Sequence, residues 1–210
     1  MFDLTRFSLF LAAALLLAIA PGPGMLYVLS RTLAGGRREG VLSAVGTFFG
    51  GMIHVFAAAA GVSVILAKSA LAFSVVKYAG AAYLCFLGLK MIIDARRNGE
   101  LPPASTSSAA RNPLWQGIAT EVLNPKTALF FLSFIPQFVN HHTSHVFLQF
   151  VILGTISVSL NTTADLVVTL LAGPLGETIR NSTTFRRRQR TATGAIMIGL
   201  GTYLATSDSQ

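Results

Sequence analysis

The sequence predicts an all-α, polytopic membrane protein with six transmembrane helices, arranged as two inverted three-helix repeats. Three observations lead to this prediction. Hydrophobic residues make up 52% of the 210 residues and charged residues only 11%, whereas soluble domains carry about 25% charged residues. Most charges lie between long apolar runs. The loops between these runs alternate between many basic residues and few, as in multi-pass chains.

The first half of the chain holds three apolar runs that are long enough to cross a bilayer, which takes about 20 helical residues. These runs cover residues 7–29, 41–67 and 70–93. His54 alone interrupts the second run, and Lys77 and Lys90 lie toward the ends of the third. We therefore expect three spans before the middle of the chain.

The second half follows a polar linker, 94–111, and its first span is less regular. The charge-free stretch 127–139 is too short to cross alone. The fourth span should therefore begin near Gly117 and include Glu121 and Lys126. The fifth span and a short sixth span are predicted at 146–172 and 191–207.

Each half, 1–99 and 101–210, holds three predicted spans, and an odd number reverses the direction of insertion. The second half must therefore insert upside down relative to the first. The prediction is a single transmembrane domain, 1–210, built from an inverted repeat and joined by a cytoplasmic linker, a design common in secondary transporters.

Basic residues predict the orientation of the chain. The loops on one side hold twelve of them: Arg31, Arg37, Arg38, Lys90, Arg96, Arg97, Arg111, Arg180, Arg186, Arg187, Arg188 and Arg190. The other side holds three: Arg6, Lys68 and Lys77. The positive-inside rule places the richer side in the cytoplasm and both termini outside. Anionic headgroups, rather than nucleic acid, explain the net charge of +8.

The N-terminal run has an alternative interpretation as a cleaved signal peptide. Arg6, the apolar run and Ala18-Ile19-Ala20 fit that pattern. However, Pro21 would then be the first mature residue, which is a poor cleavage context. Cleavage would also leave an odd number of spans, so we expect the segment to be retained as the first span.

Helix breakers interrupt the first and fourth spans at corresponding positions. The first span contains Pro21-Gly22-Pro23-Gly24, and the fourth contains Asn124-Pro125 and later Pro136. Proline lacks a backbone donor and glycine adds conformational freedom, so both clusters should break the helix. Backbone groups freed at this depth are tolerated where they line a cavity or face protein. Paired broken spans indicate a transport site, and a packing kink is the alternative.

Three ionisable residues lie within predicted spans, where such groups usually mark function. Lys126 directly follows the break at Pro125 and either faces the pathway or extends toward the cytoplasm. Glu121 is expected at the membrane interface. Asp165 is a candidate partner for a proton or an ammonium group. It belongs to a polar stripe with four-residue spacing, formed by Ser157, Asn161, Asp165 and Thr169. A structural seam between helices is the alternative.

Other features bear on partners and cofactors. Glycines should let the spans approach closely and would allow a homodimer; they are Gly46, Gly50, Gly51, Gly80 and Gly88. The single cysteine, Cys85, is expected to be a small buried hydrophobe. His141, His142 and His145 give only a weak hint of a metal site. No cofactor motif and no hydrolase or nucleotide-binding motif is present, so an enzyme embedded in the membrane is a remote alternative.

Several motifs together suggest a family. They are Pro21-Gly22-Pro23, the glycines Gly36, Gly40, Gly46 and Gly50, Gly80-Ala81-Ala82-Tyr83-Leu84 with Gly88, and Asn124-Pro125-Lys126 followed by Phe130-Phe131 and Phe134-Ile135-Pro136-Gln137-Phe138. In their order and in the number of spans, they resemble the LysE/RhtB family of amino-acid exporters. The resemblance covers nearly the whole chain, although Asp165 matches no family motif.

The resemblance implies secondary active export of amino acids across the cytoplasmic (inner) membrane of a bacterium, driven by the proton-motive force. Threonine-like, homoserine-like or other small amino acids are the expected substrates, and a metal or inorganic-ion exporter is the alternative. We expect alternating access around a midplane site formed by Pro21, Gly22, Pro23, Gly24, Asn124, Pro125, Lys126, Asn161 and Asp165. Half-helix N–H groups and Lys126 would receive the carboxylate of the substrate, and Asp165 its ammonium group or a proton.

Overall fold

The computed structural model describes residues 4–68, 70–97, 112–140, 145–181 and 183–206. Every regular element within these ranges is a helix. They are α1 (Leu4–Ile19), α2 (Pro23–Lys68), α3 (Ala70–Arg97), α4 (Pro113–Val122), α5 (Pro125–Leu129), the π-helix η2 (Phe130–Phe134), the 3₁₀-helix η3 (Ile135–Phe138), α6 (Val146–Asn181) and α7 (Thr183–Thr206). The predicted all-α fold is confirmed.

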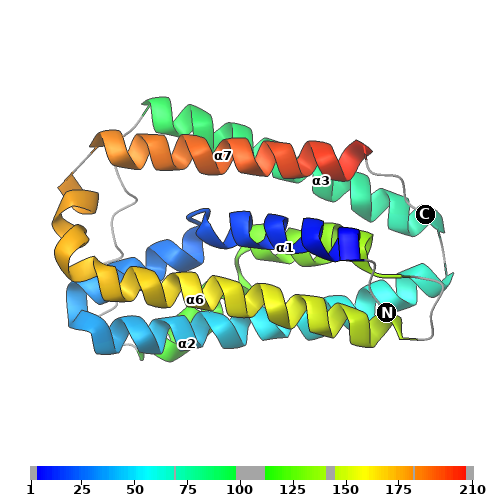
Figure 1. The fold of residues 1–210 in the computed structure, drawn as a ribbon, viewed down its shortest axis with the longest axis horizontal. Coiled ribbons are helices and arrows are strands. Elements are labelled where there is room, and N and C mark those ends of the chain that lie inside the picture. The colour runs from blue at the N-terminus through cyan, green and yellow to red at the C-terminus, as the bar shows by residue number, and fades with distance from the viewer. Residues whose placement is uncertain (1–3, 69, 98–111, 141–144, 182, 207–210) are drawn as a thin grey trace.

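The long helices run side by side along one axis (Figure 1). α2 packs against α4 and α6, α3 packs against α7, and α1 contacts α6 and η3. The start of α1 and the end of α7 lie at one end of the bundle, and the connection from α6 to α7 lies at the other (Figure 1). This arrangement is consistent with an even number of crossings, and the cytoplasmic placement of the basic end stays a prediction.

Apolar helices of membrane-spanning length identify the chain as a multi-pass membrane protein. By length and composition, three described helical segments can cross a bilayer: Pro23–Gly61, Lys77–Arg96 and Val146–Ala172. Pro113–Val122 and Pro125–Phe138, which are bent by 47° at their junction, pass the same test only as a pair and give a fourth candidate if they are counted as one span. α1 is shorter, and α7 begins with a basic turn. The count of six spans therefore stays a prediction.

α2 consists of two helical parts that meet at Gly36, whose φ of 79° and ψ of −177° are far from helical values. This backbone region is accessible essentially only to glycine. The first predicted span therefore comprises α1 and residues 23–35 of α2. Placing Arg31 in a loop was wrong: its side chain is 5% exposed and forms an ion pair of 3.2 Å with Glu39.

Other boundaries also differ from the predictions. α3 continues through Arg97, so the start of the linker at 94 was too early, and residues 98–111 lie outside the described part of the chain. The fourth span begins at Pro113 rather than near Gly117. The basic run before the expected sixth span is also helical. The expected span is therefore only the second part of α7.

Glycines bring two pairs of helices into backbone contact, as predicted. A Cβ atom on Gly117 of α4 would lie 3.0 Å from the Cα of Gly46 in α2. A Cβ on Gly88 of α3 would lie 2.5 Å from the carbonyl oxygen of Gly194 in α7, and the reverse contact has the same length. Close packing of this kind holds helices together in lipid, where no hydrophobic force drives helices to associate.

Candidate functional site

The break in the first span lies between Ile19 and Pro23. Pro21 and Pro23 cannot donate backbone hydrogen bonds, so the helix stops and restarts here. The break exposes carbonyl groups at the end of α1. The ammonium group of Lys126 donates to two of them, at 3.1 Å to Leu17 and 2.7 Å to Ala20. Lys126 is 8% exposed and therefore acts as a cap for α1 from another span.

The break in the fourth span lies at Leu123 and Asn124. Asn124 is the N-cap of α5, because its Oδ1 accepts a bond of 3.1 Å from the backbone N–H of Lys126. Its Nδ2 donates to the carboxylate of Glu121 at 3.2 Å. The hydroxyl of Thr127 donates to the other oxygen of that carboxylate at 2.6 Å. This break is therefore stabilised by its own side chains.

The carboxylate of Glu121 also lies against the start of α2. A Cβ atom on Gly24 would be 2.5 Å from Oε2 of Glu121, and a Cβ on Gly22 would be 3.1 Å from Cδ of Lys126. A helix carries partial positive charge at its N-terminus and partial negative charge at its C-terminus. Glu121 thus faces the positive end of α2, and Lys126 the negative end of α1.

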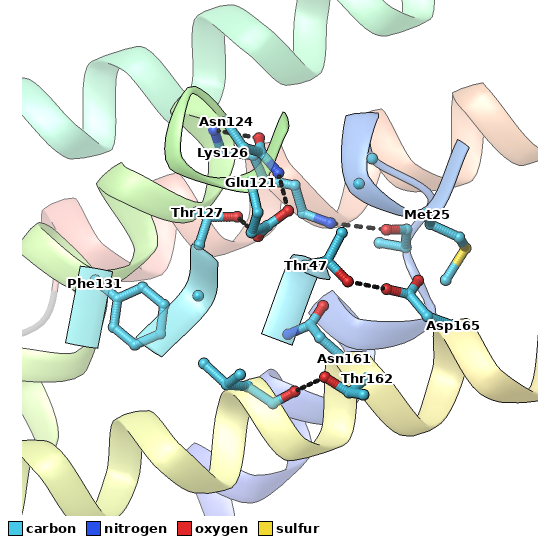
Figure 2. A pocket seen from close by; sticks show the side chains of 15 residues that line it. Met25, Thr47, Glu121, Asn124, Lys126, Thr127, Phe131, Asn161, Thr162 and Asp165 are labelled. Carbon is cyan, nitrogen blue, oxygen red and sulfur yellow. Dashed lines mark hydrogen bonds between the residues drawn. The ribbon is translucent and has the colours of Figure 1, made fainter. Parts of the chain in front are cut away.

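A cavity with about 480 Å³ of empty space, part of it open to solvent, lies between the two breaks. Side chains of the fourth span lie on one side, and Asn161, Thr162 and Asp165 of α6 lie on another (Figure 2). The lining residues are Ala20, Gly22, Gly24, Met25, Thr47, Gly51, Glu121, Asn124, Lys126, Thr127, Phe131, Val158, Asn161, Thr162 and Asp165.

Asp165 brings a carboxyl group to the cavity wall and is 6% exposed. Its Oδ2 accepts a hydrogen bond of 3.1 Å from the hydroxyl of Thr47 on α2 (Figure 2). No described residue bonds its Oδ1. This oxygen can therefore accept a proton or a hydrogen bond from a cation in the cavity.

The four residues of the polar stripe on α6 have different surroundings. Asn161 and Asp165 line the cavity. Thr169 lies 3.4 Å from the hydroxyl of Thr32 and is fully buried. Ser157 is also buried, and its hydroxyl has no partner among the described residues. The stripe thus combines a cavity wall with a seam between helices.

The structure brings most of the predicted site residues together. Six of them line the cavity: Gly22, Gly24, Asn124, Lys126, Asn161 and Asp165. Pro21, Pro23 and Pro125 do not line it but interrupt the helices beside it. The alternative in which Lys126 extends toward the cytoplasm is not found, because this side chain is buried against the end of α1. The expectation that Glu121 lies at the interface was wrong, because its side chain lines the cavity.

Sequence reasoning missed other lining residues. Thr47 lies among the glycines Gly46, Gly50 and Gly51 on one helix face, and this spacing could have identified it. His54 continues that face, and its Nε2 lies 3.0 Å from the carbonyl oxygen of Glu121. Since a carbonyl only accepts, Nε2 is the donor. Nothing in the sequence indicates that Thr47 contacts Asp165 or that His54 contacts the carbonyl of Glu121.

Metal and thiol chemistry find little support in the described part of the chain. No three His, Cys, Asp or Glu side chains within it form a group that could hold a metal ion. Of the histidine cluster, His141 and His142 lie outside the described residues. Cys85 is partly exposed rather than buried, and its Sγ lies 3.8 Å from the carbonyl of Ile198.

Comparison with known proteins identifies the family. The chain is 32% identical over 214 residues to an uncharacterised membrane protein of Pseudomonas aeruginosa, with 97% of this chain and 96% of that protein covered. It is 30% identical over 154 residues to a leucine efflux protein of Enterobacter sp., with 73% of each covered. No solved structure matches. The model of the LysE type translocator family matches residues 15–208, and the chain therefore belongs to this family of membrane translocators rather than to a family of enzymes.

Proposed function

We propose that this protein exports a neutral amino acid from the cytoplasm in exchange for protons. The observation that carries the proposal is the cavity between two broken spans, whose wall holds both a carboxylate and the N-terminus of a half-helix. An amino acid has an ammonium group and a carboxylate a few ångströms apart. The relatives named leucine efflux proteins support the same substrate class.

The ammonium group of the substrate would bind Asp165. Its Oδ1 has no partner among the described residues, while Thr47 holds Oδ2 in place at 3.1 Å. Asn161, one helical turn away, also lines the cavity. Its Nδ2 donates to the carbonyl of Ser157 at 3.0 Å, which leaves its side-chain oxygen able to accept from an ammonium group.

The carboxylate of the substrate would bind the start of α2. Gly24 and Met25 line the cavity in the first turn of that helix, where backbone N–H groups have no acceptor within the helix. These groups and the helix dipole favour an anion. Lys126 uses two of its three protons on α1, so its part is to hold the break in shape and to add positive charge nearby.

The side chain of the substrate would occupy the less polar part of the wall, formed by Gly51, Phe131 and Val158. Phe131 lies on the opposite side of the cavity from Asp165 (Figure 2). An aliphatic side chain suits these neighbours because its burial is favourable. We therefore propose leucine-like amino acids as first candidates, and the threonine-like and homoserine-like compounds implied by the resemblance as second candidates.

Proton coupling would use the same carboxylate. Protonated Asp165 is neutral and cannot hold an ammonium group by charge, so proton and substrate would compete for one site. Inward movement of one proton is favoured by about 2.3 kcal/mol per 100 mV of membrane potential. Alternation of the site between the two sides of the membrane would then convert proton entry into amino-acid export.

The contacts between helices support alternating access by two inverted halves. If the six-span prediction is applied, α2 packs against its counterpart α6, and α3 packs against its counterpart α7. Such pairing of equivalent spans is expected around a pseudo-two-fold axis in the membrane plane. The cavity lies between the two broken spans that this axis would relate.

Efflux from dipeptide-loaded cells tests the proposal. Cells with the protein should release leucine or a related neutral amino acid faster than cells without it, and an uncoupler should remove the difference. Asp165→Asn should lower export at least about tenfold because the amide cannot bind ammonium by charge. Asp94→Asn, the same change at an exposed position of α3, is the matched control.

The outcomes separate function from mechanism. If wild-type protein releases none of the amino acids faster than control cells, the proposed function is wrong, and inorganic ions become the next substrates to test. If wild-type protein exports and Asp165→Asn exports equally well, the function stands and the role of Asp165 is wrong.

A further inference from the structure

Residues 23–35 of α2 form a helical segment with an interruption of the helix at each end. One end follows the break at Ala20–Gly22, which contains Pro21 and Gly22 and precedes Pro23, the first residue of α2. The other end reaches Gly36, whose φ of 79° and ψ of −177° lie outside the helical region. A Cβ on Gly36 would meet nothing within 4 Å, so the glycine is required by conformation and not by packing. We call this segment, 23–35, the rod.

The rod connects the cavity to the basic end of the bundle. Gly24 and Met25 at its start line the cavity. Its far end carries Arg31 and Thr32, next to the turn at Gly36 (blue in Figure 1). The positive-inside rule places this end in the cytoplasm. The rod therefore lies between the proposed substrate site and the predicted cytoplasmic face.

Side-chain contacts tie the rod to two other helices. The hydroxyl of Tyr27 donates to the carbonyl oxygen of Pro113, at the start of α4, over 2.7 Å. The hydroxyls of Thr32 and Thr169 touch at 3.4 Å and pack the rod against α6, although each donates its proton within its own helix, to Val28 and to Asp165. Both threonines are almost completely buried. Hydrogen bonds between membrane helices are weak on average, so these links can break and re-form.

The second part of α2 is held differently. A Cβ on Gly46 would contact the carbonyl oxygen of Leu114, and a Cβ on Gly50 would lie 2.8 Å from the carbonyl oxygen of Ile118. Here the backbones of α2 and α4 touch, and close-packed interiors resist continuous deformation. The part of α2 after Gly36 is therefore held by backbone contact, whereas the part before it is held by side chains, including the ion pair of 3.2 Å between Arg31 and Glu39 across Gly36.

We propose that residues 23–35 are the cytoplasmic gate of the transport cycle, and that Tyr27 and Thr32 hold this gate closed. The inference rests on the proposed export function. It assigns Tyr27, Thr32 and Thr169 as positioning residues, which control access to the cavity without lining it. Movement of the rod about Gly36 opens the cavity toward the cytoplasm, and renewed contact of Tyr27 with Pro113 and of Thr32 with Thr169 closes it.

A reversible cross-link between the rod and α6 tests the gate. Thr32→Cys and Thr169→Cys are combined in a Cys85→Ser background, which removes the single native cysteine. Disulfide formation is followed by counting free thiols in denatured protein. Oxidation should lower export at least tenfold, and reduction should restore it. Each single-cysteine variant under the same oxidant is the control.

The outcomes are distinct. Failure of the pair to form a disulfide, or undiminished export by the cross-linked protein, overturns the gate. Export by the oxidised pair is compared with export by the same pair after reduction. Absence of export from both the reduced pair and the unmodified chain argues instead against the proposed function.

A second measurement does not depend on the cysteine pair. Tyr27→Phe keeps the ring and removes the bond to Pro113. In inside-out vesicles, a cysteine placed at Met25 in the Cys85→Ser background should react with a thiol reagent about 3- to 15-fold faster when Tyr27 is replaced, since one interhelical hydrogen bond shifts a two-state equilibrium by about that factor. An unchanged or slower reaction would overturn the role of Tyr27.

Discussion

The two broken spans solve the same physical problem in different ways. At the break of the fourth span, Asn124 caps α5. Asn124 and Thr127 also donate hydrogen bonds to the carboxylate of Glu121, which lies just before the break. At the break of the first span, the exposed carbonyls of α1 are bonded by Lys126, which comes from the fourth span. One break is stabilised locally, and the other depends on a partner more than 100 residues away.

This difference explains why both charges of the fourth span flank its break. Glu121 precedes the break and faces the start of α2, and Lys126 follows it and faces the end of α1. The fourth span therefore sets the geometry of both breaks. The first span contributes no charged side chain between Arg6 and Arg31, so the charged side chains beside its break come from the fourth span.

The largest expected effect comes from Lys126→Met, which keeps the length of the side chain and removes its charge. Two carbonyls of α1 would lose their donor, and each charged hydrogen bond is worth about 1.5–3 kcal/mol. We expect a loss of about 3 kcal/mol or more in stability and at least a tenfold loss of export. Unfolding in mixed detergent micelles and the efflux assay measure the two effects.

Lys126→Arg is the control for this substitution, because the guanidinium group keeps the charge and several donors. It should retain more stability than Lys126→Met. Equal stability of Lys126→Met and wild type would show that the first break does not depend on the fourth span.

Gly24→Ala should have the next largest effect. The new methyl group would lie 2.5 Å from Oε2 of Glu121, so the carboxylate must leave Asn124 or Thr127. Overpacking of this kind costs about 1–3 kcal/mol. The double variant Gly24→Ala, Glu121→Ala should lose less stability than the sum of the two single losses, because the clash then has no partner.

Gly199→Ala is the matched control for this pair, since a Cβ at Gly199 meets nothing within 4 Å. It should be neutral or slightly stabilising in the same unfolding measurement. Strict additivity of the Gly24 and Glu121 substitutions would contradict the contact between them.

The smallest effect is expected for Asn124→Ala, which removes the local cap of α5. Loss of an N-cap costs about 0.5–2 kcal/mol. Asn112 provides a matched comparison, because it caps α4 before Pro113 with a bond of 3.0 Å to the N–H of Leu114 and is exposed. Asn124→Ala should lose more stability than Asn112→Ala, because the buried Asn124 also donates to Glu121, and only Asn124→Ala should lower export. If Asn112→Ala lowered export as much as Asn124→Ala, the export loss of Asn124→Ala could not be assigned to its position beside the cavity.

The sequence sufficed to place both breaks, because proline and glycine act on the backbone at their own positions. It also identified Lys126 and Asp165, since charges in apolar runs are conspicuous. It did not identify Thr47 as the partner of Asp165 or the position of Glu121, because both depend on contacts between distant segments. The full length of α7 was missed because its basic first turns resemble a loop in composition.

The reciprocal contact of Gly88 and Gly194 has a consequence for biosynthesis. α3 packs chiefly against α7, which comes later in the chain and is therefore made later. After Arg97 leaves the ribosome, about a hundred further residues must be added before α7 is complete, which takes roughly 5–20 s at about 5–20 residues per second. During this time α3 has a glycine face without its partner. A chain that ends before α7 should therefore expose this face to quality-control proteases of the membrane.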